Sequence, residues 1–155
     1  MRATILLAPL ALLLGGCIGT PEGSAPVPVL DEAVYEAEVQ PILVARCGNP
    51  TCHGRPERPF SIYGPERYRE DPARTFLQEP LTDDEVAANY ARACAFSLGI
   101  DAPTECLLLR KPLAVTAGGA GHVGGELWAS PDDPEYRTVE AWLATARAAD
   151  PEGSR

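Results

Sequence analysis

The chain has 155 residues, of which 45% are hydrophobic and 23% charged, a composition typical of one soluble globular domain. It contains no apolar run long enough for repeated membrane spans, which excludes a polytopic membrane protein. The 22 acidic residues outnumber the 13 basic ones, giving a formal charge of −9, and no basic stripe occurs. Such a surface repels phosphate backbones, so nucleic acid is not an expected partner.

The N-terminus has the pattern of an export signal. A positive start at Met1-Arg2 precedes a short apolar segment, Ala3 to Leu14, which ends in Leu-Gly-Gly-Cys17. This ending resembles the bacterial lipobox, which implies that residues 1–16 are removed and Cys17 is lipidated. The alternative is an ordinary signal peptide with an incidental cysteine. The resemblance predicts a lipid-anchored protein of the bacterial cell envelope, facing the periplasm or the cell surface, with the outer membrane left open.

Residues 17–30 are small and rich in proline, as expected of a flexible tether without a core of its own. The globular domain is expected over residues 31–150, with a disordered tail at 151–155. Four cysteines remain after the predicted cleavage, namely Cys47, Cys52, Cys94 and Cys106. Because exported compartments are oxidising, these cysteines should be bridged, metal-bound or covalently modified.

The domain is predicted to be all-α with long loops, because no convincing strand pattern occurs. Asp31 can cap a helix over about residues 32–46, in which Pro41 predicts a kink or break near Gln40. That helix should bury one face, formed by Tyr35, Val39, Ile42 and Leu43. Thr82 and Glu85 form a capping box that opens a helix through about Phe96, with inward residues Val86, Tyr90 and Ala93.

The C-terminal half contains three further features. A short apolar segment covers residues 107–109, and residues 118–125 form a glycine-rich loop around His122. Asp133 followed by Pro134 predicts the start of a helix that runs to about Ala148. The residues it should bury are Tyr136, Val139, Trp142 and Leu143. Trp128 and Trp142 are expected in the core.

The sharpest chemical feature is Cys47-Gly-Asn-Pro-Thr-Cys52-His53. In c-type cytochromes two thiols add to the haem vinyl groups and the adjacent histidine is the proximal iron ligand. The usual spacer has two residues, whereas four separate Cys47 from Cys52. Three alternatives remain open: a Cys47–Cys52 disulfide, a zinc site that adds His53 and His122 to the two cysteines, and a redox cysteine pair.

The surrounding sequence resembles planctomycete-type cytochrome c domains over roughly residues 33–148. The matching segments are Val39-Gln-Pro-Ile-Leu-Val-Ala-Arg-Cys47 with Cys52-His53-Gly54, then Leu109-Arg-Lys-Pro-Leu113, the Gly/His loop, and Asp133-Pro-Glu-Tyr-Arg-Thr-Val-Glu-Ala-Trp142. The resemblance implies a small helical cytochrome c-like fold with covalent haem c. Cys47 and Cys52 would hold the haem, and His53 would be its proximal ligand.

The distal ligand follows by elimination. The only methionine is Met1, so the His/Met pairing of many cytochromes is not possible in the mature chain. His122 is the only other histidine, and the glycines around it permit close approach to a flat macrocycle. The alternatives are an exposed His122 in a glycine-rich turn, with Lys111 or water at the iron.

With Cys47 and Cys52 assigned to haem, Cys94 and Cys106 are expected to form a disulfide. Arg110 and Lys111 could neutralise the haem propionates or could be a solvated basic pair. No nucleophile elbow, metalloprotease helix or phosphate loop occurs, so an enzyme is not predicted.

The leading hypothesis is an exported, lipid-anchored monohaem cytochrome that transfers electrons to a redox partner with a basic docking face. The rival is a non-catalytic surface lipoprotein stapled by two disulfides, without haem. With haem, both sulfurs should face one slot wide enough for a porphyrin, with the two imidazoles on opposite sides. Without haem, His53 and His122 have no reason to meet, and the Cys47 and Cys52 sulfurs should lie at bonding distance.

Overall fold

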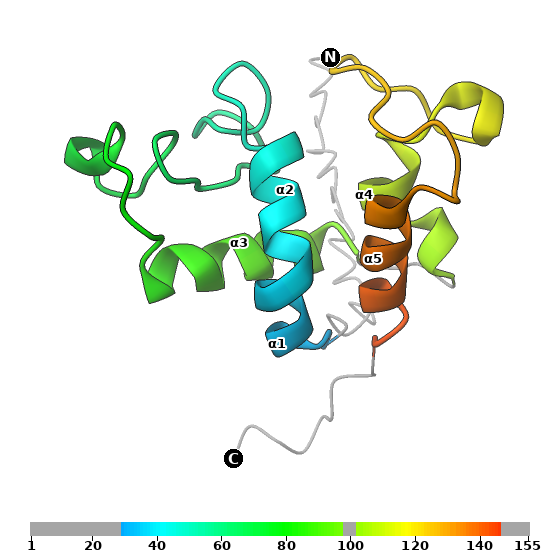
Figure 1. Ribbon diagram of the computed structural model, residues 1–155, viewed down its shortest axis with the longest axis horizontal. Coiled ribbons are helices and arrows are strands. Elements are labelled where there is room, and N and C mark those ends of the chain that lie inside the picture. Colours follow the sequence, from blue (N-terminus) through cyan, green and yellow to red (C-terminus); the bar gives the residue numbers. More distant parts are fainter. Residues whose placement is uncertain (1–28, 98–101, 147–155) are drawn as a thin grey trace, which may run out of the picture.

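The computed structural model describes residues 29–97 and 102–146. The predicted signal peptide, lipidated Cys17, most of the tether, the predicted helix end at Ala148 and the tail lie outside these residues. Within them the chain is helical (Figure 1). The only β-type pairing in which both residues are described is an isolated bridge from Leu113 to Trp128. The all-α prediction is therefore confirmed. No helix in the described ranges is long and apolar enough to cross a membrane.

The first helical rod consists of α1 (Glu32–Val34), a π-helical turn (Tyr35–Val39) and α2 (Gln40–Arg46). Asp31 caps it as predicted, because its side chain accepts a hydrogen bond from Val34 N at 3.0 Å. The perturbation expected near Gln40 is present, and it takes the form of a wider turn in which Gln40 N donates to Tyr35 O. Pro41 lacks an N–H and its ring crowds the preceding turn, so the wider turn accommodates it without ending the rod.

Helix α3 (Asp83–Ala95) begins with the predicted capping box. Glu85 N donates to Thr82 Oγ1, and Thr82 N donates to Glu85 Oε2. Of the residues expected on the inner face, Ala93 is buried, whereas Val86 and Tyr90 are half-buried. The deepest positions of this helix also include Glu85 and Asn89, two polar residues whose burial the apolar pattern did not predict.

Helix α5 (Pro134–Leu143) starts at Pro134 behind the cap Asp133, as the sequence predicts. All four residues expected in its buried face are buried, namely Tyr136, Val139, Trp142 and Leu143. The predicted extension toward Ala148 is wrong, because Ala144 and Thr145 form a turn. The Thr145 hydroxyl donates to Trp142 O and accepts from Asp31 N, which ties this turn to the start of the first helix.

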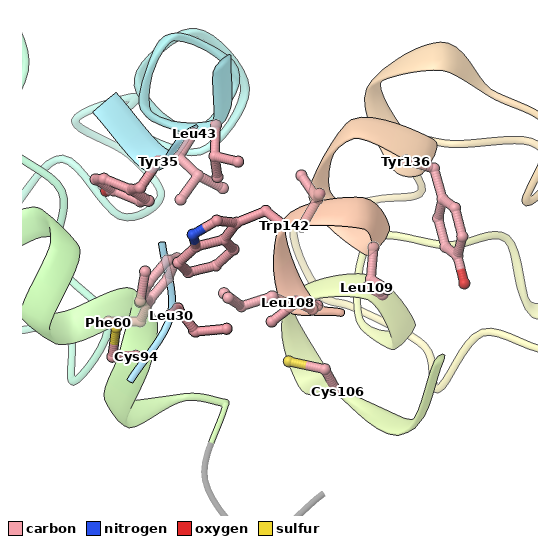
Figure 2. Packing of buried hydrophobic residues seen from close by; sticks show 14 of the residues in the cluster. Leu30, Tyr35, Leu43, Phe60, Cys94, Cys106, Leu108, Leu109, Tyr136 and Trp142 are labelled. Atoms are coloured by element: carbon pink, nitrogen blue, oxygen red, sulfur yellow. The ribbon is translucent and has the colours of Figure 1, made fainter. Parts of the chain in front are cut away.

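The core lies where the first helical rod, α3, α4 (Leu107–Arg110) and α5 meet (Figure 2). Trp142 is fully buried there, with its ring centre 5.2 Å from that of Tyr35, and its Nε1 donates to Asp31 O at 2.9 Å. Trp128 is also buried, so the prediction that both tryptophans belong to the core is confirmed. These contacts hold the two ends of the described chain side by side.

A buried ion pair fixes the irregular segment that precedes α3. Arg69 and Glu85 are both almost fully buried, and three hydrogen bonds of 2.7–3.1 Å join the guanidinium to the carboxylate. Arg69 also donates to Glu79 O and Pro80 O, and Glu85 accepts from Glu70 N. Because both charges are hydrogen-bonded on several sides, the pair tolerates its removal from water.

We predict that Glu85→Gln lowers the free energy of unfolding by about 3–5 kcal/mol, because it leaves the buried Arg69 charge without a partner. Burial alone would raise the pKa of Glu85, but hydrogen bonds from Arg69, Thr82 and Glu70 lower it to about 2. A lowered folded-state pKa means that this stabilisation is complete above pH 4.5, the ordinary value, and is lost as the pH falls toward 2.

The measurement is urea denaturation at pH 7 and at stepwise lower pH. Asp84→Asn, at an exposed position of the same helical turn, is the control and should change stability by less than about 0.5 kcal/mol. Equal effects of the two variants would contradict this account.

Candidate functional site

The segment from Cys47 to His53 folds back on the end of α2. Cys47 N donates to Leu43 O as the cap of this helix, and His53 N returns to donate to Cys47 O at 3.1 Å. Between them, Cys52 N and Gly54 N both donate to Asn49 O. The four-residue spacer thus forms a closed turn that brings Cys52 and His53 back beside Cys47.

Gly54 makes this turn possible. A Cβ atom at this position would lie 2.2 Å from Gly48 O and 2.9 Å from the Asn49 carbonyl carbon. Both are backbone atoms within the turn, so they cannot move aside as a flexible side chain would. The glycine that follows His53 is therefore required by close packing of the backbone on itself.

The His53 ring is half-buried and held by its backbone surroundings. Nδ1 lies 2.6 Å from Phe60 O, and because a carbonyl only accepts, Nδ1 must carry the proton. Burial lowers the pKa of His53; the hydrogen bond to Phe60 opposes this, while His122 lowers the pKa further. Nε2 is consequently the unprotonated nitrogen of a neutral ring, the form in which imidazole binds a metal.

His122 is presented by the glycine-rich loop. Gly118, Gly121 and Gly125 adopt φ angles of 97°, 73° and 92°, a region that favours glycine. His122 Nδ1 lies 3.2 Å from Gly125 O, and Gly125 N donates back to His122 O. As with His53, a protonated Nδ1 pairs with a carbonyl, so Nε2 is the nitrogen that this hydrogen bond does not use.

The fold brings these two histidines together. Their ring centres are 5.9 Å apart and their planes are within 11° of parallel, although 69 positions separate them in the sequence. An imidazole nitrogen lies about 2 Å from a metal ion that it binds, so two rings on opposite sides of one ion have centres roughly 6 Å apart. The observed centre-to-centre separation is close to that value, and the two rings are stacked with nearly parallel planes.

The four cysteines in the described residues are free thiols. Cys47 and Cys52 are half-buried, and the bond between them that the rival hypothesis requires is not formed. Burial, with smaller contributions from Cys52 and Glu135, raises the pKa of Cys47 to about 12, so this thiol is neutral. The described residues contain no group of three or more His, Cys, Asp or Glu side chains placed to hold a metal ion, so the zinc alternative is not formed.

The disulfide expected between Cys94 and Cys106 is also not formed in the structure. Cys106 Sγ lies 3.5 Å from Phe96 O and 3.8 Å from Ser97 Oγ, both of which can accept its weak hydrogen bond. Cys94 lies on α3 and Cys106 at the start of α4, and their side chains are well separated in Figure 2. Both thiols are buried in the apolar core, where cysteine packs as a small hydrophobic residue.

Arg110 and Lys111 lie at the surface, as the solvated alternative expected. Arg110 forms an exposed ion pair with Glu105 at 3.1 Å. Lys111 Nζ lies 3.4 Å from Gly121 O, which places it against the loop that carries His122. Arg58 was not singled out in the sequence, yet its Nε donates to Cys52 O at 3.0 Å.

Large apolar side chains are exposed on the segment around His122. Val115 and Leu127 are partly exposed and Val123 fully so. Glu126 accepts from Val115 N, and a Cβ atom built on Gly121 would touch Val115. Exposed apolar side chains on the segment that carries His122 suit an apolar ligand better than a solvated ion.

Comparison with protein-family models, with curated proteins and with solved structures found no significant match. The function is therefore argued from the residues of this chain.

We predict that Gly54→Ala destabilises the protein by about 1–3 kcal/mol, because the added Cβ collides with backbone atoms. Thermal unfolding followed by circular dichroism measures the change. Gly64→Ala is the matched control, since its Cβ would first meet a Val44 methyl group at 3.1 Å, which can shift slightly. A Gly54→Ala variant as stable as the control would show that the turn adapts without cost.

Proposed function

We propose that the protein is an exported, lipid-anchored monohaem c-type cytochrome that transfers electrons. The observation that carries this proposal is the pairing of His53 with His122 at 5.9 Å, each with Nδ1 on a backbone carbonyl. Two imidazoles that each use Nδ1 for a backbone carbonyl leave Nε2 as the atom that would bind a haem iron. In a surface lipoprotein without a cofactor, no ligand would require these two rings to lie together.

The other residues fit the same group. Cys47 and Cys52 are unbonded thiols in the turn that ends at His53, as covalent attachment of a haem requires. The apolar residues Val115, Val123 and Leu127 lie on the segment around His122, where they would cover a macrocycle. In this proposal Cys47 and Cys52 hold the haem, His53 is the proximal ligand and His122 the distal ligand.

Bound haem supplies a one-electron couple at its iron. The chain's own residues orient both imidazoles: Phe60 O holds the His53 ring and Gly125 O holds the His122 ring. If His53 and His122 both bound the iron, no open position would remain for a substrate, which favours electron transfer over catalysis. The acidic chain would dock on a basic face of a redox partner, with an on-rate that falls as salt is added.

The Cys47–Cys52 pair gives the first test of this function. A Cys17→Ser variant co-expressed with a cytochrome c maturation system should gain the mass of one haem that survives denaturation. The control, Cys17→Ser with Cys47→Ser and Cys52→Ser, should gain none. A mass lower by two hydrogens for each disulfide, without haem, would instead support the stapled lipoprotein.

His122 gives the second test. In the haem-loaded protein, His122→Ala should convert a low-spin absorption spectrum into a high-spin one, because a strong axial ligand is lost. The haem mass should be retained, since the thioether bonds do not involve His122. A low-spin spectrum that is unchanged by this substitution would remove His122 from the iron and make Lys111 the next candidate.

A further inference from the structure

An open hollow of about 430 Å³ lies on the surface beside the turn that ends at His53. All of its lining residues come from the stretch between residues 50 and 76. The walls combine apolar and charged side chains, among them Pro50, Pro56, Phe76, Arg55, Arg67 and Glu66. This mixture suits a partner that presents both apolar and charged groups.

Phe76, at the rim of the hollow, is the only exposed side chain among the ten aromatic residues, all of which lie in the described ranges. Its ring is 88% exposed, and the neighbouring Leu77 is 42% exposed. The backbone here is held by two hydrogen bonds: Leu77 N donates to Arg74 O at 3.0 Å, and Glu66 N donates to Leu77 O at 3.1 Å. Single exposed apolar residues are common, but two adjacent ones held outward beside a hollow indicate a contact surface.

The stretch that lines the hollow also differs in charge from the rest of the chain. Residues 50–76 contain five arginines and four acidic residues, a net charge of +1, which leaves −10 for the remaining residues. In the described part of the chain neither Arg67 nor Arg58 forms an ion pair. Arg67 donates to Val44 O and Arg58 to Cys52 O. No carboxylate neutralises these two guanidinium groups, which can therefore still bind a phosphate.

We propose that Phe76, Leu77 and the hollow beside them form a docking surface for an anionic lipid bilayer. The inference rests on the lipid anchor at Cys17 that is part of the proposed function. Residues 18–28 separate this cysteine from the first described residue. A flexible chain of about eleven residues spans on the order of 20 Å. The anchor would keep the domain this close to the bilayer, so a contact that is weak by itself becomes occupied.

A bilayer surface offers the chemistry that this docking surface needs. The Phe76 and Leu77 side chains can enter the boundary between headgroups and acyl chains, while Arg67 binds a lipid phosphate. The rest of the chain is strongly acidic and is repelled by anionic headgroups, which favours this one orientation. The turn Pro72–Arg74, in green in Figure 1, lies at the edge of the molecule away from α4 and α5. A loop at this edge can meet a flat surface before those helices do.

The direct test is flotation of the Cys17→Ser protein, purified after co-expression with the maturation system, with vesicles of equal parts phosphatidylethanolamine and phosphatidylglycerol. Without acyl chains, binding depends on the protein surface alone. Phe76→Ala should lower the partition coefficient by about tenfold, because a large apolar side chain no longer enters the lipid. Phe76→Trp should retain binding. Leu107→Ala, which removes a 45% exposed apolar side chain from α4, is the matched control and should change it by less than about twofold.

The lipid charge gives the second readout. Arg67→Gln should weaken binding to these vesicles by about fivefold, the usual contribution of one basic side chain near an anionic surface. On vesicles of phosphatidylcholine, which has no net charge, the substitution should have no effect. Arg67→Lys keeps the charge and should bind like the parent. A loss of binding in Arg67→Lys equal to that in Arg67→Gln would show that the hydrogen bond to Val44 O matters and the charge does not.

The outcomes separate the docking surface from the anchor. Equal partition of Phe76→Ala and Leu107→Ala, or no binding of the parent to either kind of vesicle, would overturn the docking surface and leave the anchor standing. A dimer in sedimentation equilibrium that Phe76→Ala dissociates would also overturn it, because a second copy of the chain would then be the occupant. The mass of the unsubstituted protein tests the anchor: absence of acyl chains at Cys17 would overturn the lipid-anchored function, and this inference with it.

Discussion

The packing of Trp142 against the first helical rod is the constraint on which the other parts of the structure depend. Its indole ring lies beside Tyr35, and its Nε1 donates to Asp31 O at the start of that rod. Arg46, at the other end of the rod, binds Glu135 in the first turn of α5 through two hydrogen bonds. Two contacts at opposite ends fix how the rod and α5 cross. This crossing in turn determines where two segments lie: the one that follows the rod and the one that precedes α5.

The two histidines come from those segments. His53 follows the rod through a turn closed by Asn49 and Cys47, and His122 lies in the loop that precedes α5. The bridge between Leu113 and Trp128 closes the base of the His122 loop. Each ring is oriented by a hydrogen bond to one backbone carbonyl close in sequence. The fold thus brings the two rings together, and local hydrogen bonds set their orientation.

The partners of polar groups in the core could not be predicted from the pattern of hydrophobic residues. Glu85 was explained completely as part of a capping box, and the same carboxylate also neutralises the buried Arg69. A capping residue normally faces water, so its local pattern carries no sign of a partner sixteen positions away. The thiols of Cys94 and Cys106 show the same limit, because spacing and count suggested a bond, whereas packing placed each sulfur against other neighbours.

The sequence by itself determined the helix starts at Asp31, Thr82 and Asp133 and the buried face of α5, and it singled out the cysteines and histidines of the candidate site. These depend on caps, proline and periodicity, which act within a few residues. It also located the disturbance at Pro41, whereas the form of that disturbance, a π turn, depended on packing. Only the tertiary structure decided that His53 meets His122 and that Arg69 pairs with Glu85. Each of these joins segments through long loops, whose path is set by the burial of distant side chains and not by local preference.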